Sequence, residues 1–196
     1  MVNEDIIKFE ICRALRALYE KGLINALSGN ISVRIPKANA FWITPSGVFK
    51  GSVTPNDLVK LDFELNILEG VRKPSIESGT HALIYKVRPD VNAIVHTHNP
   101  ITVALVGLGY NLEFLSSEAE LIIKKIKIIP YAPPGSEELA RLIYNNVKNE
   151  KDVKALILLK HGVIGLGSSL VEAVSIVESI EDLAKMNLIK LLFKGR

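Results

Sequence analysis

The sequence predicts an α/β fold in which a mixed, largely antiparallel sheet carries helices on both of its faces. Segments with apolar residues at helical spacing alternate along the 196 residues with short apolar runs of strand length. Such alternation is typical of parallel sheets, but the connections within residues 40–62 and 157–165 are too short for helical crossovers. Several neighbouring strands should therefore pair antiparallel. No internal repeat or long flexible linker interrupts the chain, so we expect a single domain, residues 1–196.

The N-terminal half is predicted to begin with a helix and to continue with strands. Apolar residues recur at helical spacing from Asp5 to about Lys21, and Gly22 can end this helix. Four strand candidates follow at residues 31–35, 40–44, 58–61 and 67–68, and the last two can pair across a turn at residues 62–66. Ser75 can cap a helix that runs from about Ile76 to Val87.

The C-terminal half alternates strands and helices more regularly. The predicted strands cover residues 92–96, 127–130 and 155–159, and residues 163–165 can continue the last of them. The predicted helices run from Pro100 to about Val106, from Gly135 to about Val147, and from a cap at Ser169 to about Phe193. No element is assigned between residues 107 and 126.

Composition and charge indicate a soluble globular protein. Hydrophobic residues make up 48% of the chain and charged residues 23%, while a net charge of +3 is too weak to indicate a nucleic-acid partner. Cys12 is the single cysteine, so no intrachain disulfide can form, which suits a reducing compartment. The sequence shows no signal peptide and no apolar run near the roughly 20 residues that span a bilayer. We expect a cytoplasmic protein without nucleic-acid or membrane partners.

Three of the four histidines occupy positions that favour a catalytic metal. His96 and His98 flank Thr97 at the end of an apolar strand, and residues two apart on a strand point to the same side. His161 directly follows another apolar strand and can supply a third nitrogen. Three protein ligands leave a coordination position open for water or substrate, which is typical of catalytic sites. For His81, packing or hydrogen bonding is the favoured role over ligation.

A His-x-His pair occurs in several unrelated metal-binding folds, but three of them do not fit this chain. Metallo-β-lactamase-like hydrolases carry an aspartate two residues after the second histidine, where this chain has Pro100. Cupins and all-β carbonic anhydrases are dominated by strands, whereas helical patterns cover much of this sequence.

Glu77 and two loops are further site candidates, each with an ordinary structural alternative. A carboxylate beside a metal can move a proton next to a carbonyl, but Glu77 equally fits an acid in the first turn of a helix. The loops at residues 26–30 and 44–47, together with Ser75, offer hydroxyls, glycines and backbone N–H groups to an anion, or form ordinary turns. Neither loop is a Walker or dinucleotide motif, so we predict neither a nucleoside triphosphate nor NAD.

Taken in order, these motifs resemble the class II aldolase/adducin family. The matching segments are Gly29-Asn30, Thr44-Pro45-Ser46-Gly47, Pro74-Ser75-x-Glu77, His96-Thr97-His98 and His161-Gly162. The resemblance spans about residues 10 to 190 and is strongest to members that cleave L-fuculose 1-phosphate. It implies a three-layer α/β/α sandwich around a largely antiparallel sheet, and a homotetramer with active sites between subunits.

The resemblance also implies a reaction and a role for each site residue. The reaction is the reversible cleavage of a ketose 1-phosphate, such as L-fuculose 1-phosphate, into dihydroxyacetone phosphate and a lactaldehyde-like aldehyde. His96, His98 and His161 would bind one zinc ion per subunit, with cobalt, manganese or iron as alternatives. Glu77 would be the catalytic acid/base and an additional metal ligand. The implied contacts to the substrate phosphate are Gly29, Asn30, Ser46, Gly47 and Ser75.

Three features depart from the family pattern and concern mainly the aldehyde side of the reaction. Ile76 stands where a second serine is frequent. Residues 112–120 contain no tyrosine to act as the acid for the aldehyde, and Tyr110 and Tyr131 are the candidates to replace it. The C-terminal residues 193–196 lack the tail that carries another substrate-facing tyrosine.

Three alternatives to the aldolase remain open from the sequence. L-ribulose-5-phosphate 4-epimerases share the metal motif but carry aspartate where Glu77 stands. A methylthioribulose-1-phosphate dehydratase-like enzyme also pairs a metal with a glutamate. A non-catalytic interaction module, like the head domain of adducin, would not need to retain the histidines or Glu77.

Overall fold

The fold is built on one eight-stranded mixed sheet, seen in a computed structural model that describes residues 3–193. The strands are β1 (Asn30–Arg34), β2 (Ala40–Ile43), β3 (Val59–Asp62), β4 (Ile67–Glu69), β5 (Ala93–Thr97), β6 (Lys125–Ile129), β7 (Val153–Leu158) and β8 (Gly162–Gly167). They are ordered β4-β3-β2-β1-β5-β8-β7-β6, and within this sheet only β6 and β7 pair in parallel. The predicted mixed, largely antiparallel sheet is therefore confirmed.

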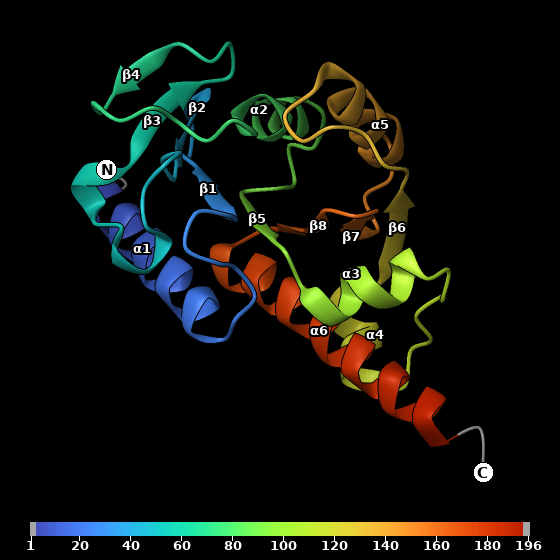
Figure 1. The fold of residues 1–196 in the computed structure, drawn as a ribbon. Coiled ribbons are helices and arrows are strands. Elements are labelled where there is room, and N and C mark those ends of the chain that lie inside the picture. The colour runs from blue at the N-terminus through green and yellow to red at the C-terminus, as the bar shows by residue number, and fades with distance from the viewer. Residues whose placement is uncertain (1–2, 194–196) are drawn as a thin grey trace.

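Helices cover both faces of this sheet (Figure 1). One face carries α1 (Glu4–Glu20), α3 (Pro100–Gly107), α4 (Ser117–Ile123) and α6 (Leu170–Phe193), and the other carries α2 (Ser78–Val87) and α5 (Glu137–Val147). Successive residues of β7 alternate between the two apolar layers, since Ile157 packs with α6 and Leu156 with the opposite layer. Within residues 3–193, no helix combines the length and apolarity needed to cross a membrane.

Local signals in the sequence explain several helix ends. Gly22 has a φ of +70° after α1, and the backbone N–H groups of Gly22 and Leu23 donate to the carbonyls of Tyr19 and Leu18. This is a Schellman ending, which glycine adopts without a steric penalty. At the start of α6, the Ser169 hydroxyl accepts a hydrogen bond from the N–H of Glu172 at 3.2 Å, as expected of a helix cap.

Three parts of the fold differ from the prediction. The helix expected from Ile76 begins at Ser78, because Ser75 forms a separate turn in which its carbonyl accepts from the N–H of Ser78. The short helix α4 was not predicted, although Ser116 caps it by accepting from the N–H of Ala119. Residues 163–165 do not continue β7; they belong to β8, which reverses direction after a turn at Lys160 with φ +60°.

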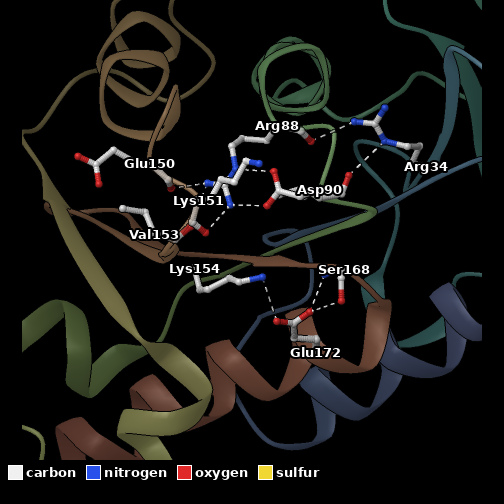
Figure 2. Close-up of polar contacts among 10 residues, drawn as sticks. Arg34, Arg88, Asp90, Glu150, Lys151, Val153, Lys154, Ser168 and Glu172 are labelled. Carbon is white, nitrogen blue, oxygen red and sulfur yellow. Dashed lines mark hydrogen bonds and ion pairs between the residues drawn. The ribbon is translucent and has the colours of Figure 1, made fainter.

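A buried arginine, Arg88, joins the connection between α2 and β5 to the connection between α5 and β7 (Figure 2). Arg88 is only 1% exposed, and its guanidinium donates to both carboxylate oxygens of Asp90 at 2.9 and 2.8 Å. It also donates to the backbone carbonyls of Glu150, Lys151 and Val153. With its donors satisfied, Arg88 fixes the start of β5 against the start of β7, the two strands whose far ends carry the predicted site.

Candidate metal centre and substrate pocket

The three predicted metal-binding histidines converge at one end of the sheet. His96 lies in β5, His98 follows this strand, and His161 lies in the turn between β7 and β8. Because β5 pairs with β8, the turn that carries His161 lies beside the end of β5. The ring centroids are 4.7 to 5.5 Å apart, and one ligand nitrogen from each ring lies within 4.8 Å of the others.

The hydrogen bonds of these rings leave nitrogens free for a metal. Nδ1 of His96 lies 3.0 Å from the carbonyl of Val163, which can only accept, so Nδ1 carries a proton and Nε2 is the nitrogen left to face a metal. Nε2 of His96 and Nδ1 of His161 are buried without a hydrogen-bond partner among the described residues. Burial, and then the proximity of His96, lower the pKa values of His98 and His161 to about 4. Neutral imidazoles with free nitrogens fit a divalent cation.

Glu77 places its carboxylate against two of the histidines. Its Oε2 is 3.4 Å from Nε2 of His96, and its Oε1 is 3.4 Å from Nε2 of His161. The side-chain amide of Asn30 donates to Oε2 at 2.6 Å. Burial alone would raise the pKa of Glu77, but His96, the Asn30 hydrogen bond and His161 together lower the pKa to about 2. Glu77 is therefore ionised at neutral pH although it is only 7% exposed.

The start of α2 explains how Glu77 reaches the histidines. Glu77 precedes the first turn and does not cap the helix with its side chain. Its backbone N–H donates to the Ser75 hydroxyl at 3.3 Å, within the turn that delays the helix. The interpretation of Glu77 as an acid inside the first helical turn is therefore wrong. The delayed helix start leaves the carboxylate in contact with the sheet end.

His81 lies apart from the three-histidine cluster, in a buried polar network. Its Nδ1 is 2.7 Å from the hydroxyl of Ser32, and that hydroxyl is 2.8 Å from the hydroxyl of Tyr85. Full burial lowers the pKa of His81 to about 4, so the ring is neutral. Hydrogen bonding is thus its visible role, as favoured from the sequence.

A cavity of about 250 Å³ adjoins the histidine cluster and collects most of the predicted phosphate contacts. The predicted residues that line it are Gly29, Asn30, Ser46, Ser75, Glu77, His96, His98 and His161. Gly47 belongs to the same loop as Ser46, with φ +67°, but is not among the lining residues. A larger cavity of about 410 Å³ lies between α1 and α6, yet it contains none of the histidines.

Two polar features of the cavity were not anticipated from the sequence. Lys50 lines it and is 2% exposed, although a lysine in a polar loop usually indicates a solvated side chain. Asn30 was expected to contact phosphate, but its amide is already engaged by Glu77. Tyr110 and Tyr131 do not line the cavity; they are 45% and 53% exposed.

Comparison with known proteins places this chain and its fold in a family. Residues 9–188 match the class II aldolase and adducin N-terminal domain, and the chain belongs to this family. An L-fuculose phosphate aldolase from Methanocaldococcus jannaschii is 34% identical over 187 residues, which cover 95% of this chain and 98% of the relative. The crystal structure of L-fuculose-1-phosphate aldolase from Thermus thermophilus superposes with a TM-score of 0.82 at 30% identity and covers 94% of each chain.

Family members that are as similar to this chain as the aldolases are named for different reactions. A 3-oxo-tetronate 4-phosphate decarboxylase from Haemophilus influenzae is 35% identical over 176 residues, covering 87% of this chain and 81% of the relative. The resemblance to the class II aldolase/adducin family is confirmed, while family membership alone leaves the reaction to be argued from the site.

Proposed function

We propose that this protein is a metal-dependent aldolase that reversibly cleaves a ketose 1-phosphate, such as L-fuculose 1-phosphate. The products would be dihydroxyacetone phosphate and a lactaldehyde-like aldehyde. The observation that carries this proposal is the buried Glu77 carboxylate, 3.4 Å from two imidazoles of a three-histidine cluster at the edge of a cavity. The names of the archaeal and Thermus relatives support the same substrate class.

His96, His98 and His161 would hold one divalent cation per subunit, and Glu77 would be a further ligand in the absence of substrate. Zinc suits three imidazoles, and cobalt, manganese or iron could occupy the same nitrogens. When bound, the ion supplies Lewis acidity that polarises the substrate carbonyl and stabilises negative charge beside it.

Glu77 moves the proton at the carbon next to the carbonyl. In the synthetic direction, its carboxylate removes a proton from the hydroxymethyl carbon of dihydroxyacetone phosphate, and this carbon then forms the bond to the aldehyde. In the cleavage direction, Glu77 returns the proton to the same carbon after the bond breaks. The hydrogen bond from Asn30 holds the carboxylate in place and favours its ionised form.

The loops around the cavity orient the phosphorylated end of the substrate. Gly29, Ser46 and Ser75 line the cavity and would offer hydroxyl and backbone N–H donors, with Gly47 next to Ser46 in the same loop. Asn30 would link this region to Glu77. Fixing the substrate in a reactive geometry can lower the activation free energy by several kcal/mol, on the order of half of the reduction that a typical enzyme achieves. The family resemblance implies that the acid serving the aldehyde comes from a neighbouring subunit of a homotetramer; within their own subunit, Tyr110 and Tyr131 do not line the cavity.

The proposal is tested by incubating the zinc-loaded protein with a panel of phosphorylated ketoses and identifying products by mass. We expect dihydroxyacetone phosphate from a ketose 1-phosphate, loss of activity after chelation, and recovery on adding zinc. Full turnover after exhaustive metal removal would contradict the metal-dependent mechanism. The same panel separates an aldolase from a dehydratase or a decarboxylase by product mass. A 4-epimerase gives a product with the mass of its substrate, which chromatographic separation of the two epimers detects.

Glu77→Gln is the matched variant for this experiment. It preserves the size of the side chain but removes the base. The variant should therefore no longer catalyse exchange of the proton on the hydroxymethyl carbon of dihydroxyacetone phosphate with deuterated solvent. A non-catalytic interaction module would show neither exchange nor cleavage in the wild type.

A further inference from the structure

Lys50 links the two loops that were expected to hold an anion. It begins the short helix η1 (Lys50–Ser52), and its backbone N–H donates to the carbonyl of Ala26 at 2.8 Å. Its side chain turns back along the chain, and Nζ donates to the carbonyl of Pro45. Lys50 therefore contacts both the loop at residues 26–30 and the loop at residues 44–47, from one buried position.

The charge of Lys50 has no partner of opposite sign in residues 3–193. No carboxylate of this described part of the chain lies within ion-pair distance, and Pro45 provides the one acceptor there for an ammonium group with three donors. Lys154, which is also mostly buried at 9% exposed, instead pairs with Glu172 at 3.1 Å. Burial without a counter-charge lowers the pKa of Lys50 to about 8. A buried cation with free donors is unfavourable unless an anion joins it.

The cavity itself indicates where such an anion would bind. Lys50, Ser46 and Ser75 all line the same 250 Å³ cavity, which also contains Glu77 and the three-histidine cluster. Glu77 does not neutralise Lys50, since its carboxylate is engaged by Asn30 and lies against His96 and His161. The ammonium and the two serine hydroxyls are the chemistry that a phosphate monoester dianion requires, namely positive charge and several donors.

We propose that Lys50 is the cation that binds the phosphate group of the substrate and makes this pocket selective for phosphorylated over unphosphorylated ligands. This assignment rests on the proposed function for the identity of the complete substrate. The phosphate neutralises the charge of Lys50. It accepts hydrogen bonds from the two remaining N–H groups of the Lys50 ammonium and from the hydroxyls of Ser46 and Ser75. The position of the phosphate then fixes which substrate carbon lies near Glu77.

Inorganic phosphate is the probe that tests this role without depending on catalysis. Titration calorimetry of the zinc-loaded protein should give a dissociation constant that rises at least about tenfold in Lys50→Met, because a charge-assisted contact is lost. Lys151→Met is the matched control: it removes the same charge from an exposed loop and should leave the dissociation constant unchanged. Phosphate binding by Lys50→Met at wild-type strength would overturn the proposal, as would a wild type that binds no phosphate.

Two further measurements separate the role of the charge from an effect on folding. Lys50→Met should unfold, without phosphate, at a temperature no lower than the wild type, because it removes an unpaired buried charge. Added phosphate should raise the unfolding temperature of the wild type and of Lys151→Met but not of Lys50→Met. Lys50→Arg retains the charge and should keep phosphate binding within about fivefold. A Lys50→Arg variant that folds but loses binding as fully as Lys50→Met would also overturn the proposal.

Kinetics distinguish failure of this proposal from failure of the proposed function. For Lys50→Met, the ratio of kcat/KM for a ketose 1-phosphate to that for the unphosphorylated ketose should fall by at least about tenfold. If the ratio is unchanged in an active aldolase, the role of Lys50 is wrong and the aldolase stands. If Lys50→Met loses phosphate binding but the wild type cleaves no ketose 1-phosphate, the aldolase is wrong and the anion site stands.

Discussion

Asn30 holds the Glu77 carboxylate in position and, after His96, contributes to lowering the pKa of Glu77. Glu77 is almost fully buried, and burial by itself favours a neutral carboxyl group. The 2.6 Å hydrogen bond from the Asn30 amide opposes this effect, and it comes from the first residue of β1. A central strand of the sheet thus holds the group that would act as base, which keeps the geometry rigid.

Replacing Asn30 should slow proton transfer without removing the metal ligands. Asn30→Ala deletes the hydrogen bond to Glu77, so the pKa of Glu77 should rise and kcat should fall by roughly tenfold to a hundredfold. Because the base works when ionised, the part of the acidic limb that Glu77 causes should move upward, and the zinc content at each pH separates this shift from loss of the metal. The measurement is kcat for proton exchange against pH, together with zinc content.

Asn146→Ala is the control for this substitution, since Asn146 donates to a carbonyl within α5 and lies outside the cavity. Its pH–rate profile should match the wild type. An Asn30→Ala profile that also matches the wild type would show that Glu77 does not depend on this hydrogen bond.

The residues that carried a recognisable motif were predictable, whereas Lys50 was not. The His-x-His spacing on a strand specifies a shared direction for His96 and His98, so their convergence follows from strand geometry. The burial of Lys50 depends on the fold of two loops, 26–30 and 44–50, that meet only in the tertiary structure. Its sequence neighbours do not distinguish it from a solvated lysine.

At the scale of elements, the connection between α1 and β1 shows two glycines with different functions. Gly22 ends α1 with φ +70°, and a Cβ there would have no atom within 4 Å. Gly29 has φ +83°, and a Cβ there would lie 2.3 Å from Cγ2 of Ile24 and 3.2 Å from the carbonyl oxygen of His96. The first glycine is required by conformation alone, and the second by conformation and by space next to a predicted metal ligand.

This difference predicts unequal effects of the same substitution. Gly22→Ala should destabilise the fold by about 1 kcal/mol, the usual penalty for a left-handed non-glycine residue. Gly29→Ala adds a steric conflict of about 1–3 kcal/mol to the same conformational penalty, so the total loss in free energy of unfolding should be about 3 kcal/mol. Chemical denaturation of both variants measures the two free energies of unfolding. Equal losses of stability would mean that Ile24 moves aside without cost and that close packing at Gly29 is unimportant.

The elements that the sequence did not predict are short or depend on tertiary contacts. The helix α4 has seven residues, too few for a clear periodic pattern, although Ser116 and its following acids are a capping signal. The start of α2 depends on Ser75 and Ser78, which form a turn that brings Glu77 to the sheet. Longer elements with caps, such as α1 and α6, lie close to their predicted bounds because local and tertiary preferences agree.

For the whole molecule, the candidate metal centre joins parts of the fold that are distant in sequence. His96 and His98 belong to the end of β5, His161 to the turn before β8, and Glu77 to the start of α2. Two apolar layers of hydrophobic side chains pack on either side of the sheet, so we expect the core to form without a bound ion. A bound ion would therefore add stability to a fold that already exists.

Removal of the metal should lower stability without unfolding the chain. Chelation should reduce the unfolding temperature by about 10 °C, since ligand present at about a thousandfold its dissociation constant contributes about 4 kcal/mol. The far-ultraviolet circular dichroism spectrum should remain unchanged, because both apolar layers stay buried. His98→Ala, which lacks one ligand, should show a much smaller response to chelation.

The pH dependence of this stabilisation follows from the neutral histidines. Metal ligation requires unprotonated nitrogens, and the pKa values of His98 and His161 are lowered to about 4, chiefly by burial. Protons should therefore compete poorly above about pH 5, and the gain in unfolding temperature from zinc should persist there and disappear as the pH falls through 4. Scanning calorimetry with and without zinc across this range measures the difference. A zinc effect that is already lost near pH 6.5, the ordinary pKa of histidine, would contradict the lowered pKa values of His98 and His161.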